Sequence, residues 1–390
     1  MANIVDYLAW RGDLTFAERP FNDVDNIILS TLSYLDFTDI VPGPGKGAVS
    51  LAQASNRVLE ETEGNVDLRV RSLARLDPKM LLRLSSSRRF GHILLHDCVD
   101  KLDAGRSLQF AALQMDITPE LTYVSFRGTD SSLVGWREDF MLSFTITEAQ
   151  REALTYLECA LADARSRGRK VYVGGHSKGG NLAIYAALSC PADLQDVIAC
   201  IWNNDGPGIS HKIIPTSPRE LFGERYRRIV PAYDMVGIIF EHSNDPRTVV
   251  ASSVTGAWQH DPFTWKVLPR GVEEADDLSS ESKIMRSALK AWLSNVSLEE
   301  RAVLVDQFFD ALEASGATTL SEVTESVQSM KTVLSAMGGM DDSTKDLLRS
   351  LAGNMVAKTM ESAANAAFRA AQGVMEELKK LPEADRDAVE

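Results

Sequence analysis

The sequence predicts an α/β fold with a mostly parallel central sheet, preceded by N-terminal helices and followed by an all-helical C-terminal extension. From residue 108 to 268, runs of β-branched and aromatic residues alternate with helical segments, which is typical of strands joined by crossover helices. Before about residue 105 and after Gly271, apolar residues recur instead at the spacing of amphipathic helices.

The positions of the helices and strands follow from the spacing of the apolar residues. Asn22 or Asp23 can cap a helix with an apolar stripe from Val24 to Leu35, and further helices are expected at about 49–63 and from Pro78. We expect the main crossover helix at residues 149–164 and strands at residues 110–117, 121–126, 171–173, 197–202, 226–232 and 248–254.

The last third of the chain differs in charge and composition. A polar stretch at 273–280 reads as a linker, so we expect a domain at residues 1–271 and an acidic helical region at 272–390, with 22 acidic and 12 basic residues. Six of the twelve methionines lie between Met330 and Met375. This region is expected to pack on the rest of the chain, or to bind a protein partner or a second copy.

Composition excludes several classes of function. A net charge of −14 argues against a nucleic-acid partner held by phosphate neutralisation. The four scattered cysteines are typical of reduced thiols, and no signal peptide or transmembrane run is evident. We therefore expect a cytoplasmic protein, without a metal or other cofactor.

A candidate nucleophile lies at residues 170–181. The run Val171–Val173 meets Gly175-His-Ser177-Lys-Gly179, and a helical segment follows at once. A strand, a tight glycine-lined turn and a helix are the context of a nucleophile elbow, which exposes its serine and aims backbone N–H groups at the reacting atom. The pattern predicts Ser177 as the nucleophile, against the alternative of an ordinary glycine-rich turn.

Ser177 needs a general base, and three histidines follow it in the chain. His211 and His242 lie in polar loops, whereas His260 follows the last expected strand. In α/β-hydrolases the order along the chain is serine, acid, histidine, so His260 is favoured as the base.

Two aspartates at strand ends are candidates for the acid that orients the histidine. Asp205 follows the first strand after the elbow and Asp234 the second. The later position favours Asp234, while Asp205 can instead hold its loop through an Asx-turn.

The remaining site residues follow from the same arrangement. The backbone N–H of Lys178 and the N–H and hydroxyl of Thr129, at an earlier strand end, are expected to form the oxyanion hole. The apolar residues that follow these segments either line an acyl pocket or belong to the hydrophobic core. They are Trp136, Phe140, Ile239, Phe240 and Phe263.

These motifs together resemble the class 3 lipases, which are α/β-hydrolases. The likeness rests on Tyr123–Thr129, Gly175–Gly180, Arg228–Asp234 and the downstream His260. It implies Ser177 as nucleophile, Asp234 as acid and His260 as base, with Thr129 and Lys178 in the oxyanion hole. More narrowly, the chain resembles a poorly characterised bacterial lipase-like family with Lys after the serine and an N-terminal segment like Asp6–Phe16.

One residue departs from the lipase pattern, which usually has Leu at the position of Lys178. A cation in the first turn of a helix opposes the helix dipole, so Lys178 either pairs with a carboxylate or meets an anionic substrate. We expect a serine esterase or lipase acting on an acyl ester or lipid. The alternatives are a hydrolase-like scaffold whose C-terminal helices bind a partner, and a thioesterase or acyltransferase.

Overall fold

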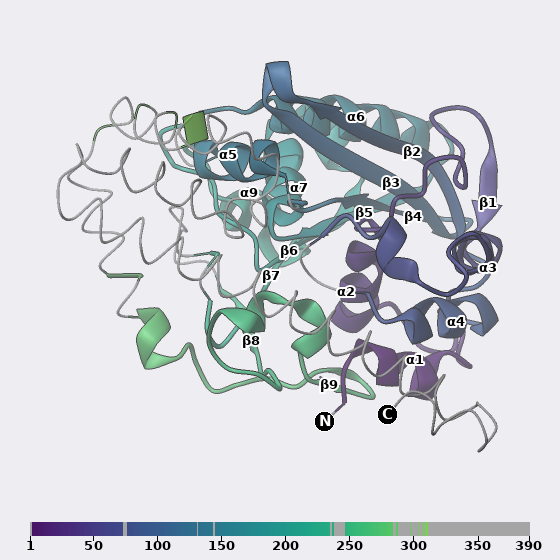
Figure 1. The fold of residues 1–390 in the computed structure, drawn as a ribbon. Helices are drawn as coiled ribbons and strands as arrows, with labels where there is room; N and C mark the ends of the chain where they lie inside the picture. The colour runs from purple at the N-terminus through teal and green to yellow at the C-terminus, as the bar shows by residue number, and fades with distance from the viewer. Residues whose placement is uncertain are drawn as a thin grey trace, which may run out of the picture.

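The computed structural model describes residues 2–72, 76–130, 132–142, 145–234, 236–237 and 246–283, with 286–287, 297, 303, 306 and 309–310. Within them, eight strands lie side by side in chain order and form one central sheet (Figure 1). They are β1 (Ala48–Ser50), β2 (Leu94–Asp103), β3 (Leu108–Thr118), β4 (Leu121–Phe126), β5 (Lys170–His176), β6 (Ile198–Asn204), β7 (Tyr226–Pro231) and β8 (Thr248–Val250).

Helices cover both faces of this sheet. The described helices are α1 (Ile4–Arg11), α2 (Asp23–Leu32), α3 (Leu51–Glu61), α4 (Pro78–Ser86), α5 (Leu133–Met141), α6 (Glu148–Ser166), α7 (Lys178–Ser189), α8 (Ala192–Gln195) and α9 (Pro218–Phe222). One hydrophobic core joins α1–α4 to the sheet, and a second joins α6 and α7 to its other face. A short hairpin, β9 (Val267–Leu268) and β10 (Gly271–Val272), follows β8.

The direction of the strands changes at β4. Strands β1 to β4 pair antiparallel, whereas β4 to β8 pair parallel, joined by crossovers that carry α5 and α6, α7 and α8, and α9. The carboxyl ends of the parallel strands therefore meet at one edge of the sheet, where α/β folds place their sites. This is the architecture of an α/β-hydrolase, as the sequence predicted.

The expected strands and the helices expected in the described ranges are present, and β1, β2, β9 and β10 are strands that the sequence did not predict. The spacing of apolar residues correctly predicted helices α2, α3, α4 and α6 and strands β3 to β7. Strand β8 ends earlier than expected, at Val250. Strand β2 was not predicted because its sequence, Leu-Leu-His-Asp-Cys-Val-Asp-Lys-Leu-Asp, is polar. In the structure its pairing with β3 is interrupted by a register shift between His96 and Val99.

The chain keeps contact with the sheet beyond Gly271. The Ala251 N–H donates to Glu273 O at 2.8 Å, and the Ala275 N–H donates to Val249 O at 2.8 Å, so residues 273–275 run beside β8. The segment expected to be a linker is therefore attached to the sheet edge. The domain boundary stays a prediction, and the helices expected beyond residue 310 lie outside the described residues.

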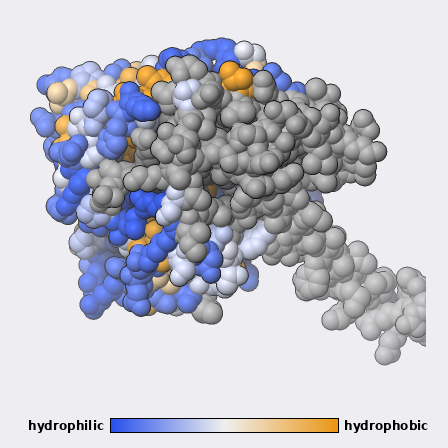
Figure 2. Space-filling view, turned by 90° about the vertical axis from the view of Figure 1, so that its left-hand side faces the viewer, coloured by the Kyte–Doolittle hydropathy of each residue, from blue (hydrophilic) through white to orange (hydrophobic). Residues whose placement is uncertain are grey.

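The face of the molecule drawn in Figure 2 is mostly polar where its residues are described. On the face drawn in Figure 2, hydrophilic residues predominate and the hydrophobic patches are small and separate. None of the helices in the described ranges has the length and hydrophobicity needed to cross a lipid bilayer.

A buried ion pair fixes the N-terminal helices. Asp25 on α2 and Arg89, after α4, are both fully buried and meet through two hydrogen bonds, of 2.8 Å from Nε and 2.6 Å from Nη2. Arg89 also donates to carbonyls of the loop between α1 and α2, including Arg19 O at 3.0 Å. The pair thus joins three segments that are distant in sequence.

Removing one partner of this pair should destabilise the protein. Arg89→Met leaves the Asp25 carboxylate buried without its cation and should lower the free energy of unfolding by about 3–5 kcal/mol. The matched control is Arg57→Met, which breaks the exposed Arg57–Glu61 pair on α3 and should cost less than about 1 kcal/mol. Denaturant unfolding measures both, and equal losses would contradict this account.

Candidate active site

The predicted elbow is present at the carboxyl end of β5. Strand β5 ends at His176, α7 begins at Lys178, and Ser177 between them has φ 58° and ψ −132°, a conformation that side chains rarely adopt. A Cβ at Gly179 would lie 2.1 Å from Phe126 O, and one at Gly175 would lie 2.3 Å from the Gly179 carbonyl carbon. The glycines therefore allow α7 to approach the sheet closely enough to hold the turn.

The structure places His260 at this serine. His260 ends a 3₁₀ turn (Gly256–His260), and its Nε2 lies 3.0 Å from Ser177 Oγ. Ser177 itself is only partly buried. Of the other two candidates, His211 is exposed and contacts Pro215 O, and His242 lies outside the described residues. The preference for His260 agrees with this geometry.

For the acid, the geometry reverses the preference between the two aspartates. The carboxylate in contact with the histidine is that of Asp205, whose Oδ2 lies 2.6 Å from His260 Nδ1. Asp205 has φ 48°, which turns the chain sharply at the end of β6. The Asx-type contact expected of Asp205 is made by Asn203, whose Oδ1 accepts from the Gly206 N–H at 2.8 Å.

Asp234 lies behind Asp205 and is fully buried. Its Oδ1 accepts from the Gly237 N–H at 2.8 Å, and its Oδ2 lies 3.3 Å from Arg228 Nη2. Burial, followed by the nearby charge of Asp205, raises the pKa of Asp234 from 3.8 to about 7.

His176 of the elbow supports His260. His176 Nε2 lies 2.8 Å from the His260 carbonyl, its Nδ1 lies 2.8 Å from the Tyr34 hydroxyl, and the two imidazole rings are 4.6 Å apart. A carbonyl only accepts, so Nε2 of His176 carries a hydrogen, and in the neutral ring Nδ1 accepts from Tyr34. His176 therefore holds the backbone of His260 and is not itself placed as the base.

The segment expected to supply the oxyanion hole lies against the elbow. A Cβ at Gly128 would come within 2.7 Å of His176 O, which shows how closely the end of β4 approaches the turn. Lys178 is the first residue of α7, where a backbone N–H has no intrahelical acceptor. The hydroxyl of Thr129, in contrast, donates to Asp139 Oδ2 on α5, and burial raises the pKa of Asp139 to about 7.

The side chain of Lys178 pairs with a carboxylate and does not face a substrate. It is fully buried, and its Nζ donates to Glu138 Oε2 at 2.6 Å and to Gln109 O and Oε1 at 2.8 and 2.9 Å. Glu138 also accepts the Ala149 N–H at 2.8 Å. Of the two expectations for Lys178, the contact with an anionic substrate is wrong, and the ion pair joins α7 to α5, β3 and the start of α6.

The expected acyl-pocket residues are only partly described. Trp136 is half-buried on α5, the helix that carries Asp139, whereas Phe263 packs against the core beside the N-terminal helices and its carbonyl accepts from Asn3. Ile239, Phe240 and the side chain of Phe140 lie outside the described residues. The acyl pocket stays a prediction.

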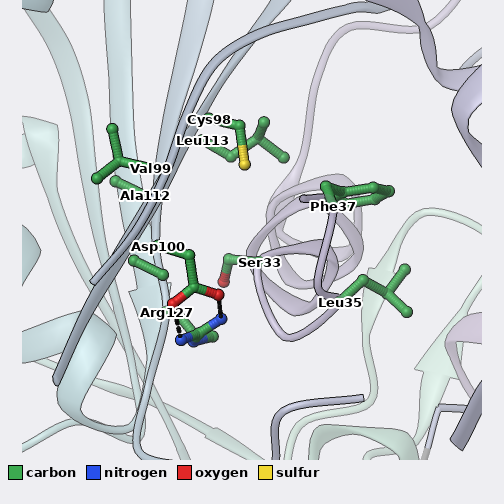
Figure 3. Close-up of a pocket in the computed structure, with 10 residues that line it drawn as sticks. Ser33, Leu35, Phe37, Cys98, Val99, Asp100, Ala112, Leu113 and Arg127 are labelled. Atoms are coloured by element: carbon green, nitrogen blue, oxygen red, sulfur yellow. Dashed lines mark hydrogen bonds and ion pairs between the residues drawn. The ribbon is translucent and has the colours of Figure 1, made fainter. Parts of the chain in front are cut away.

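Arg127 in the oxyanion segment has a role that sequence did not reveal. Its Nη1 and Nη2 form a bidentate pair with Asp100 of β2, at 2.6 and 2.7 Å, which ties the end of β4 to β2 across β3. Figure 3 shows this pair at the side of a small hollow lined also by Leu35, Phe37 and Cys98. None of the residues that line the hollow belongs to the Ser177–His260–Asp205 group.

Asn181, in the first turn of α7, is a further residue whose role appears only in the structure. Its side chain donates to Gly208 O at 2.7 Å and accepts from Gln150 Nε2 at 2.9 Å. It thereby fixes the loop that follows Asp205 against the helix of the elbow.

A family model described as Mbeg1-like matches residues 84–310, more than half of the chain. The chain belongs to the Mbeg1-like family. The match includes β2 to β10, the elbow, both aspartates and His260, so the whole candidate site lies within the family region. In this Mbeg1-like chain, the sheet topology and the elbow are those of an α/β-hydrolase fold.

Two solved lipases resemble this Mbeg1-like chain. M37 lipase shares 18% identity over 54% of this chain and 68% of its own, with a TM-score of 0.33. A fungal lipase in a complex with an inhibitor shares 15% identity over 71% of this chain and 92% of its own, with a TM-score of 0.34. A search of curated proteins found no match.

The buried pair at the elbow can be tested by charge removal. Lys178→Met leaves the Glu138 charge buried and uncompensated, so the free energy of unfolding should fall by about 3–5 kcal/mol. Adding Glu138→Gln, which removes that charge but keeps a side-chain acceptor, should recover part of the loss. If the double variant were no more stable than Lys178→Met in denaturant unfolding, the uncompensated charge would not be the cause.

Proposed function

We propose that this chain is a serine hydrolase that cleaves a carboxylic ester through an acyl-enzyme. The single observation that carries the proposal is the hydrogen-bonded series from Ser177 Oγ to His260 Nε2 and from His260 Nδ1 to Asp205 Oδ2, at 3.0 and 2.6 Å, on a strained elbow. A serine hydroxyl is a weak nucleophile by itself, and this arrangement supplies the base and the group that orients it.

The reaction follows from these contacts. Ser177 Oγ attacks the ester carbonyl carbon while its proton passes to His260 Nε2, and the negative charge forms on the carbonyl oxygen. The N–H of Lys178, at the positive end of α7, and the N–H of Thr129 are the proposed donors to that oxygen. As the C–O bond breaks, His260 gives its proton to the leaving alcohol. A water molecule, deprotonated by His260, then attacks the acyl-serine and releases the acid.

Asp205 keeps its negative charge throughout this cycle. Its carboxylate accepts the Nδ1–H of His260, which selects the tautomer with a free lone pair at Nε2 and stabilises the imidazolium that forms. Full burial of Asp205 strengthens this contact because little water screens it.

The proposed substrate class is a neutral acyl ester or a lipid. A thioesterase or acyltransferase that recognises an anionic head group through Lys178 is disfavoured, because Lys178 is neutralised by Glu138 inside the protein. The cytoplasmic location, and a partner or a second copy bound by the acidic C-terminal region, stay predictions.

The nucleophile is tested by covalent labelling. A fluorophosphonate should modify Ser177 in the folded protein, because such reagents need an activated serine, and peptide mass spectrometry should locate the adduct there. Ser177→Ala should abolish labelling without loss of the fold. A folded wild-type protein that stays unlabelled over the whole pH range of its stability would contradict the proposal.

The acid is tested by an amide substitution. Asp205→Asn preserves shape but no longer fixes the tautomer of His260, so turnover of a p-nitrophenyl ester should fall by about ten-thousandfold, as in serine protease triads. The measurement is kcat at saturating ester, with thermal unfolding as the check on folding. A loss of less than about tenfold would remove Asp205 from the assigned role.

A further inference from the structure

Two buried aspartates meet at the carboxyl ends of neighbouring strands. Asp205 follows β6 directly, and Asp234 follows β7 after a short turn; both are fully buried. The Asp205 N–H donates to Ile229 O of β7 at 2.7 Å, which fixes the two strand ends together. The charge of Asp205 is one of the causes that raise the pKa of Asp234, so the two buried groups act on each other, and only Asp205 has been given a role so far.

Two buried carboxyl groups at neighbouring strand ends do not both ionise readily, because two carboxylates repel each other and neither can donate a hydrogen bond to the other. Asp205 accepts the Nδ1–H of His260 at 2.6 Å, a short distance typical of a charged acceptor. The proton of the pair therefore belongs on Asp234.

We propose that Asp234 is a positioning residue: it stays protonated during the reaction and donates to Asp205, which keeps Asp205 ionised and turned toward His260. This inference rests on the proposed function and deepens it, because it adds a fourth residue behind Ser177, His260 and Asp205.

The space around Asp234 agrees with this role. The Gly237 N–H donates to its Oδ1, and a Cβ at Gly237 would lie 2.7 Å from both carboxyl oxygens and from Arg228 Nη2. The backbone thus closes over the Asp234 carboxyl with no room for a side chain. Ser282 Oγ donates to the Asp234 carbonyl at 2.7 Å, so the residue is fixed from a third segment.

Three charged groups decide the protonation of Asp234. Arg228 of β7 and Arg247, before β8, favour its ionised form, whereas burial and the charge of Asp205 favour the protonated form. Arg228 is a weak partner at 3.3 Å. The balance raises the pKa of Asp234 to about 7, so it holds its proton below neutral pH and loses it above.

Ionisation of Asp234 should therefore impair catalysis at alkaline pH. It removes the donor to Asp205 and places a second negative charge beside it, and the repulsion should turn Asp205 away from His260. The rate should rise on the acid side as His260 loses its proton and fall on the alkaline side as Asp234 loses its own, with apparent pKa values that belong to the coupled groups.

The experiment compares full-length wild type, Asp234→Asn and Asp205→Asn from about pH 5 to about pH 9. It measures kcat/KM on a p-nitrophenyl ester and the rate of Ser177 labelling by a fluorophosphonate. The amide that Asp234→Asn introduces would donate at every pH, so the alkaline fall should disappear. Asp205→Asn should lose about ten-thousandfold.

Asp139 is the matched control, because its buried carboxyl also has a pKa raised to about 7 and contacts Thr129. Asp139→Asn should still show the alkaline fall. If Asp234→Asn kept that fall, Asp234 would be only structural. If it lost as much activity as expected for Asp205→Asn, and Asp205→Asn lost little, Asp234 would be the orienting acid itself.

A second measurement covers the case in which Asp234→Asn does not fold. Infrared spectroscopy of the wild type and of Asp139→Asn should show the carbonyl band of a protonated carboxylic acid at pH 5–6 that disappears through about pH 7. A spectrum of Asp139→Asn without such a band would overturn the inference. Failure of Ser177 labelling at every pH would contradict the proposed function instead, since the band does not depend on activity.

Discussion

The close approach of α7 to the ends of β4 and β5 is the constraint on which the site depends. Gly175 and Gly179 bring the helix within contact of Phe126 O, at a distance that no side chain would permit. The strained backbone of Ser177 persists because this packing leaves the turn no relaxed alternative. The same approach sets the Lys178 N–H beside the segment that carries Thr129.

The elbow is held by polar contacts in its interior as well as by packing. Lys178 pairs with Glu138, which also accepts N–H groups from β3 and the start of α6. A cation in the first turn opposes the helix dipole, and a buried carboxylate at 2.6 Å offsets that cost. Helix α7, which follows Ser177, and helix α5, which follows Thr129, are thus connected by one ion pair.

Sequence reasoning predicted the fold, and it named the serine and the histidine whose side chains lie 3.0 Å apart in the structure. Each has a local signature: the alternation of strand-like and helix-like apolar spacing, the glycines around Ser177, and the position of His260 after the last strand. It ranked the two aspartates in the wrong order for contact with His260. Both follow consecutive strands, and the choice depends on the left-handed turn at Asp205 and on Asn203, which takes the turn contact expected of Asp205. The ion-pair partner of Lys178 could not be predicted from the sequence either, because Glu138 lies 40 residues earlier and no sequence pattern links the two residues.

The central claim is that Asp205, supported from behind by Asp234, orients His260. Proton NMR at a pH where His260 is charged tests it most directly, because a hydrogen shared between imidazole Nδ1 and a buried carboxylate resonates at unusually low field. That resonance should be present in the wild type and in Asp234→Asn, and absent from His260→Gln and Asp205→Asn. A resonance that survives Asp205→Asn and disappears in Asp234→Asn would contradict the account.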